Sequence, residues 1–210
     1  MDFRVNVGDL ATAAQLTYPA GRCGPFPTVI LIPGSGPYDM NFTIVDPATH
    51  QLRSQIFDMS TSLTLHRYAT VRYSTHYVTQ IGIAKEVQEY YSKFTVQRLL
   101  ADATKFYEAT RTSPQVDPSH IYLLSPRMER GTSIAAQVNV VLATGKRDHP
   151  PIVHPNRGHS PAPAPTTFAD NSTPIAQQPL RDVVAWLDRH TGQAPSSATP
   201  GVGTPTASGA

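Results

Sequence analysis

The loop Pro33–Pro37, with the sequence PGSGP, could stabilise a developing negative charge. It directly follows the apolar run Thr28–Ile32. Its two glycines let the chain turn sharply and present amide N–H groups to a small anion or an oxyanion. A plain turn at the end of a strand would have the same composition. A phosphate-binding loop is less favoured, because neither a Lys-Thr or Lys-Ser pair nor a helix start follows the glycines.

A second group of residues that could do chemistry lies late in the chain. It comprises Asp148, His149, His154 and His159, all within twelve residues. Such oxygen and nitrogen donors could bind a divalent metal. Histidines are common in proline-rich loops, however, and this stretch offers no helical spacing of ligands, so we predict neither a metal nor a cofactor. An imidazole can also exchange protons near neutral pH, as general acid–base catalysis requires.

Composition excludes several classes of protein. Cys23 is the single cysteine, which rules out intramolecular disulfides and multi-cysteine metal sites. Lys+Arg 17 against Asp+Glu 15 gives a net charge of +2, which favours neither nucleic-acid nor anionic-membrane partners. The first residues contain no apolar stretch of signal-peptide length, and no apolar run long enough to span a membrane occurs. We therefore expect a cytoplasmic protein.

The elements that must position these residues alternate between strands and helices. Apolar or alternating runs predict strands at 3–7, 13–18, 28–32, 68–73 and 121–124, and amphipathic stretches predict helices at 51–65, 95–110 and 180–189. The pattern at 133–143 fits a helix, a strand or both. Alternation of this kind predicts an α/β sheet, in which ligands bind in loops beyond the carboxyl ends of the strands.

The composition divides the chain into two parts. Residues 1–192 contain the predicted elements and form one domain. Residues 193–210 consist almost entirely of Ala, Ser, Thr, Pro and Gly. They cannot bury enough apolar surface to offset the loss of conformational entropy on ordering, so we predict a disordered tail.

Several segments together form an ordered series. They are, in chain order, LTYPAG, GPFPTVILIPGSGPYD, YATVRY, EYYSKFTVQRLLADA, VDPSHIYLL, GTSIAAQV, NRGHS and LRDVVAWLDRHTG. This series resembles the α/β-hydrolase superfamily, most closely its esterase and acyl-peptidase-like members, over roughly residues 10–192. The resemblance implies a mostly parallel sheet flanked by helices and a serine-type carboxylic-ester hydrolase.

The resemblance also implies roles for individual residues. His159, in NRGHS, corresponds to the catalytic base, and Asp148, in GKRD, corresponds to the carboxylate that orients it. The backbone amides of Ser35 and Gly36 correspond to part of the oxyanion hole. A small-molecule acyl ester would be the substrate.

The nucleophile turn departs from the family pattern. A Gly-x-Ser-x-Gly turn is expected directly after residues 121–124, but Arg127 occupies the serine position, and Ser125 and Glu129 occupy the glycine positions. The nearest hydroxyls belong to Ser125, at the end of the predicted strand, and Ser133, within the ambiguous segment. Ser125 is the candidate nucleophile.

The second half of the chain is short. Only 24 residues separate Leu124 from Asp148, and 11 separate Asp148 from His159, whereas each parallel crossover needs about a dozen or more. We therefore expect a truncated sheet without a cap domain, whose apolar surface a protein partner would cover. Two functions stay open: an active carboxylic-ester hydrolase, or a catalytically inactive hydrolase-like interaction module, which Arg127 favours.

Overall fold

The computed structural model describes residues 1–8, 10–34, 36–46, 49–79, 83–128, 135–142, 152–155 and 177–192. The predicted tail, residues 193–210, lies outside these ranges. So do Ser35, Ser133, Asp148 and His159.

A mixed seven-stranded sheet forms the centre of the described structure, with the strand order β1-β2-β6-β3-β7-β8-β9. The strands are β1 (Asp2–Val7), β2 (Leu10–Thr17), β3 (Phe26–Leu31), β6 (Ala69–Tyr73), β7 (Val116–Met128), β8 (Ala135–Leu142) and β9 (Ile152–Pro155). The three central strands β6, β3 and β7 run parallel, whereas the outer pairs are antiparallel. Two further strands, β4 (Thr43–Val45) and β5 (Leu52–Ser54), pair separately.

The central strands form because their side chains are apolar or β-branched without alternation. Val29 and Ile30 of β3 have no exposed surface, and every residue of β6 is buried. Strands covered on both faces show such a continuous run, as in 28–32. The strand predicted at 68–73 also forms, and its buried residues include Arg72.

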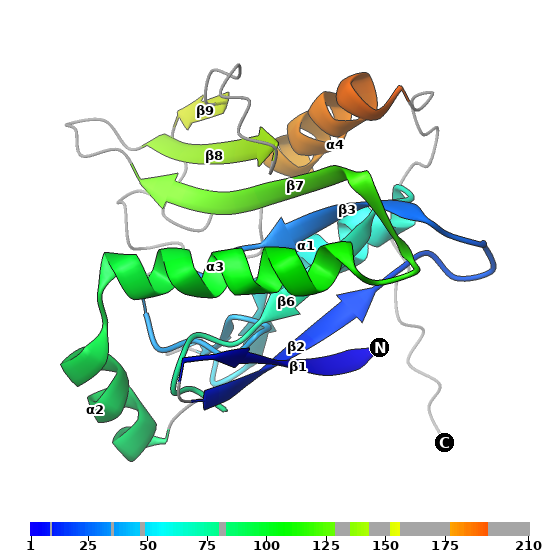
Figure 1. Ribbon diagram of the computed structural model, residues 1–210. Coiled ribbons are helices and arrows are strands. Elements are labelled where there is room, and N and C mark those ends of the chain that lie inside the picture. Colours follow the sequence, from blue (N-terminus) through cyan, green and yellow to red (C-terminus); the bar gives the residue numbers. More distant parts are fainter. Residues whose placement is uncertain are drawn as a thin grey trace, which may run out of the picture.

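Helices cover both faces of the sheet. They are α1 (Gln55–Leu65), α2 (Ala84–Lys93), α3 (Val96–Arg111) and α4 (Gln177–Thr191). Phe106 of α3 is fully buried in one apolar cluster, while Leu63 of α1 and Leu187 of α4 belong to a second cluster on the opposite face. Figure 1 shows α3 in front of the sheet and α1 and α4 behind it.

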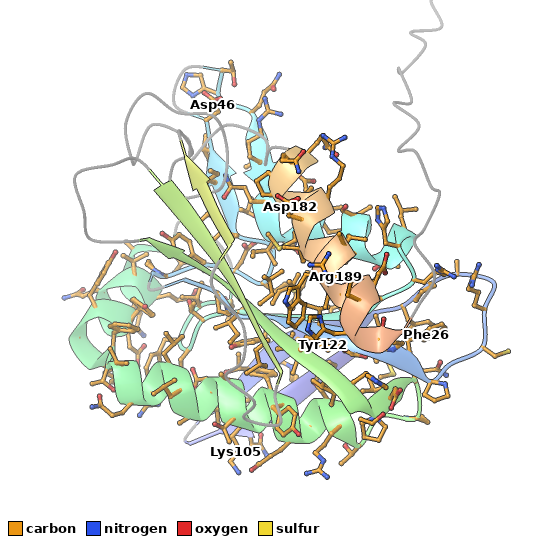
Figure 2. All side chains as sticks on the ribbon, turned by 90° about the horizontal axis from the view of Figure 1, so that it is seen from above. Phe26, Asp46, Lys105, Tyr122, Asp182 and Arg189 are labelled. Atoms are coloured by element: carbon orange, nitrogen blue, oxygen red, sulfur yellow. The ribbon has the colours of Figure 1, made fainter. Side chains whose placement is uncertain are left out.

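Trp186 packs α4 onto the sheet. Its ring meets the ring of Tyr122 edge to face, with the centroids 5.7 Å apart. Figure 2, viewed from above, shows Tyr122 between β7 and α4, and Lys105 on the outer side of α3. The structure thus confirms the predicted α/β class, with a sheet flanked by helices.

In the second half, the structure decides between the alternatives that the sequence left open at 133–143. The segment that could have been a helix from residue 133 contains the strand β8, which pairs antiparallel with β7. The link between them, residues 129–134, is too short for a parallel crossover but long enough for a hairpin. This pairing extends β7 to Met128, four residues beyond the predicted strand 121–124.

Candidate functional site

The loop Pro33–Pro37 and Ser125 lie at the same edge of the parallel part of the sheet. The parallel register of β3 with β7 ends at the pair Leu31 and Leu124. One residue further, the Ile32 N–H donates to the Leu124 carbonyl oxygen at 2.9 Å. This is the carboxyl edge, where α/β sheets bind their ligands. Two of the predicted site positions, Gly36 and Ser125, therefore belong to this edge.

Ser125 lies within a continuous strand. It pairs with Asn139 of β8, and two residues later Arg127 pairs with Gln137. A nucleophile elbow needs a sharp turn from strand to helix at this position. The backbone of β7 instead stays extended through Met128.

The Gly36 amide, which was predicted to bind an oxyanion, is hydrogen-bonded within its own loop. Its N–H donates to the Gly34 carbonyl oxygen at 3.0 Å. Gly36 is buried, and a Cβ atom there would collide with the ring of Tyr38. The loop is therefore closely packed, and glycine is required at this position for lack of space.

Thr75 joins this loop to the end of β6. Its hydroxyl accepts from the Tyr38 N–H at 2.9 Å and donates to the Tyr38 carbonyl oxygen at 3.0 Å. The Thr75 N–H donates to the same carbonyl at 2.9 Å. These three bonds, which we call the Thr75 latch, fix the loop after β3 against the loop after β6.

A small cavity of about 10 Å³ lies beside the Thr75 latch. Its aromatic wall consists of Tyr73, Tyr77, Tyr90 and Phe94, and Pro33 closes one side. A volume of this size accommodates about one water molecule. Because Pro33 follows β3 and Tyr73 ends β6, the cavity belongs to the carboxyl edge of the sheet.

Three ionisable side chains line this cavity and contact one another. The Arg98 Nη1 lies 2.9 Å from the Nε2 of His76, and the Nδ1 of His76 lies 3.6 Å from the Oδ1 of Asp102. Arginine has only donors, so Nε2 accepts and the ring proton lies on Nδ1, on the side of Asp102. The ring nitrogen that could take a proton from a nucleophile is thus occupied by Arg98.

Burial dominates the electrostatics of this cluster. It raises the pKa of Asp102 to about 6, against the opposing effect of the positive charge of Arg98. Burial also raises the pKa of Tyr73 and of Tyr90, and the charge of Asp102 adds to both shifts. Both phenols therefore stay protonated and can donate hydrogen bonds.

The helix α3 places Asp102 in the cavity. Its first turn is capped by the Thr95 hydroxyl, which accepts from the Arg98 N–H at 3.1 Å. Asp102 lies three residues after Leu99 and four before Phe106, on the face that packs against the sheet.

Sequence reasoning treated Arg98 and Asp102 as polar positions of an amphipathic helix and missed their role. The spacing of Asp102 from Leu99 and Phe106 was the signal that could have revealed it. His76, in the segment after β6, was not among the residues predicted to do chemistry. The structure brings these three residues together.

The proposed base His159 and its orienter Asp148 lie outside the described residues. Among the residues that the structure does describe, no group of three or more His, Cys, Asp or Glu side chains could hold a metal ion. None of the described helices is long and apolar enough to cross a membrane.

Comparison with known proteins gives likeness in fold. No protein-family model matches the sequence, and no curated protein matches it. Among solved structures, the chain is similar to one named m3DLH, at 14% identity and a TM-score of 0.45, over 60% of this chain and 48% of that one. It is also similar to a 2,6-dihydroxy-pseudo-oxynicotine hydrolase, at 13% identity and a TM-score of 0.43, over 60% of this chain and 29% of that one.

A third similar structure is a dienelactone hydrolase-like promiscuous phosphotriesterase from metagenomic libraries. It shows 17% identity and a TM-score of 0.43, over 60% of this chain and 48% of that one. The chain thus spans about half or less of the length of these proteins.

Proposed function

We propose that this chain is a catalytically inactive hydrolase-like binding module, which takes a small ligand at the carboxyl edge of its sheet without serine acyl transfer. One observation carries the proposal. β7 runs straight through the position where the resembling family has its nucleophile turn, and there it pairs with β8. A serine on a paired strand lacks the exposed, strained geometry of a nucleophile elbow.

The buried imidazole supports the same conclusion. General base catalysis needs a ring nitrogen that is available to the attacking hydroxyl. The Nε2 of His76 accepts from Arg98, whose guanidinium offers hydrogen-bond donors and no acceptor. The Asp102–His76–Arg98 arrangement therefore holds a neutral imidazole in place and favours binding over proton transfer.

The protein partner expected from the sequence is part of this proposal. In the described sheet, β1 and β9 are the end strands. An end strand carries backbone N–H and C=O groups that can pair with a further strand. A protein partner could add a strand at either end by hydrogen-bonding to these backbone groups.

Carboxylic-ester hydrolysis is the second candidate, and the position of Ser125 favours it. Ser125 is the first residue beyond the parallel ladder and follows Leu124, whose carbonyl binds the strand that leads into Pro33–Pro37. In this alternative Ser125 would attack the ester carbonyl, His159 would accept its proton and Asp148 would orient the imidazole. The amides of Ser35 and Gly36 would stabilise the oxyanion.

A fluorophosphonate probe decides between the two candidates. We expect the full chain to show no covalent labelling at Ser125 and no turnover of p-nitrophenyl acetate above that of His159→Ala. Circular dichroism with a thermal melt must first show that both proteins fold cooperatively, and an active serine esterase serves as the positive control. Labelling at Ser125 that disappears in His159→Ala would overturn the inactive module and establish the hydrolase.

A further inference from the structure

We propose that the cavity at the carboxyl edge binds a neutral hydroxyl group through Tyr73, Tyr90 and Asp102. This inference rests on the binding role proposed above and names the chemistry of the ligand. The hydroxyl belongs either to a water molecule or to a small phenol.

Three buried polar atoms line the same cavity. Tyr73, Tyr90 and Asp102 are 2%, 3% and 5% exposed. Both phenol oxygens and the Oδ1 of Asp102 have no hydrogen-bond partner among the described residues. Buried polar groups in folded proteins almost always have a partner, so three at one cavity indicate a shared guest.

The three side chains line one cavity of about 10 Å³, which places them around the same small space. The charge of Asp102 contributes to the raised pKa of both tyrosines. They come from three different elements: Tyr73 from β6, Tyr90 from α2 and Asp102 from α3. A guest in this cavity would bridge the sheet and the two helices.

The donor and acceptor types select a hydroxyl. Above its pKa of about 6, Asp102 is a carboxylate and only accepts hydrogen bonds, whereas the protonated phenols donate. A hydroxyl oxygen satisfies all three, because it donates its one proton to Asp102 and accepts from both tyrosines. An anion would face the Asp102 carboxylate, and a cation would face Arg98, which also lines the cavity.

The volume of the cavity fits a water molecule, and its apolar lining suits the ring of a phenol. About 10 Å³ is the space of one water molecule. Phe94 and Leu99 line it with apolar surface. A phenol ring exceeds this volume, so a phenol would contact Phe94 and Leu99 only if it displaced the aromatic wall, whereas a water molecule needs no displacement.

Phenol and toluene form the matched pair of probes, because they differ by one hydroxyl. Binding to the full-length chain is measured by titration calorimetry and by thermal shift at pH 8, where Asp102 is ionised. We expect phenol to bind at least tenfold more tightly than toluene, and Tyr73→Phe and Tyr90→Phe each to reduce this preference at least threefold. Tyr91→Phe is the control, because Tyr91 is exposed on the same helix as Tyr90.

The second arm looks for water. If phenol does not bind, a crystal structure or a water-to-tyrosine nuclear Overhauser effect should reveal a water held by Tyr73, Tyr90 and Asp102, and Tyr73→Phe should release it. Equal binding of phenol and toluene, or a cavity with neither phenol nor water, overturns the inference. Neither result depends on labelling of Ser125, so failure here and failure of the proposed function are distinguishable.

Discussion

At the scale of single residues, Gly36 shows how closely the loop after β3 is packed. Replacement by alanine places a methyl group against the Tyr38 ring, which itself packs on Phe42 with the ring centroids 4.0 Å apart. We expect Gly36→Ala to lower the free energy of unfolding by about 1–3 kcal/mol, the usual cost of overpacking. Urea denaturation followed by fluorescence measures this change.

Gly34→Ala is the matched control in the same loop. Apart from its chain neighbours, no atom of the described residues lies within 4 Å of a Cβ at Gly34, so we expect a change of no more than about 0.5 kcal/mol. If both variants lost the same stability, the contact with Tyr38 would not explain the need for glycine at position 36.

Asp102 makes stability depend on pH in the opposite sense to most carboxylates. Its pKa rises from 3.8 unfolded to about 6 folded, so the folded chain binds the proton more tightly. The buried charge therefore destabilises the fold above pH 6, and this cost disappears as the pH falls from about 6 toward 4. We expect Asp102→Asn to be more stable than the native chain by about 3 kcal/mol at pH 8 and to show no such gain at pH 4.

Urea titrations at both pH values test this sign. Glu108→Gln is the control, because Glu108 is about half exposed and its ion pair with Lys105 should contribute less than about 1 kcal/mol at either pH. If the native chain instead lost stability relative to Asp102→Asn as the pH fell from 7 to 4.5, burial would not be the dominant effect on the pKa of Asp102.

At the scale of elements, the Thr75 latch holds two loops of the carboxyl edge together. Thr75→Val keeps the shape but removes the hydroxyl bonds to the Tyr38 N–H and carbonyl. We expect a loss of about 1–3 kcal/mol and faster amide exchange at Tyr38. Thr104→Val, on the exposed side of α3, removes a hydroxyl bond to its own helix and should change stability by less than about 0.5 kcal/mol. Equal losses in the two variants would mean that the latch contributes nothing specific.

The elements differ in how far their sequence determines them. The run 28–32 could be predicted because a strand buried on both faces needs apolar residues at every position. The strands at 3–7 and 13–18 were predicted from their apolar or alternating runs, and they correspond to the antiparallel pair β1–β2. In contrast, α2 was not predicted, since Tyr90 is the buried residue of this helix and one apolar anchor gives no periodic pattern.

The candidate site was less predictable than the fold. Gly36 and Ser125 were expected at the carboxyl edge because each directly follows a strand, and the strand register places them there. The contact between His76 and Asp102 depends on how α3 packs over β6, which the hydrophobic periodicity of either segment does not specify. The extension of β7 to Met128 depends likewise on pairing with β8, a contact between segments rather than a property of either one.

At the scale of the whole molecule, α4 ties the late chain to the early sheet. The buried Tyr68, just before β6, donates its hydroxyl to the Oδ1 of Asp188 on α4 at 2.7 Å, across 120 residues of sequence. Thr191 lies 3.3 Å from the same hydroxyl. Burial and the hydrogen bond to Asp188 raise the pKa of Tyr68, so the phenol remains a donor at physiological pH.

This contact predicts that the early and late parts of the chain unfold together. Tyr68→Phe should cost about 1.5–3 kcal/mol, because it leaves a buried carboxylate without its donor. In a double-mutant cycle with Asp188→Asn, we expect a coupling free energy of at least about 1 kcal/mol and a single cooperative urea transition in every variant. Tyr18→Phe, at a partly exposed tyrosine that stacks on Phe26, is the control and should not couple to Asp188→Asn. Additive effects of Tyr68→Phe and Asp188→Asn, or two separate transitions in the native chain, would show that α4 docks independently of the sheet.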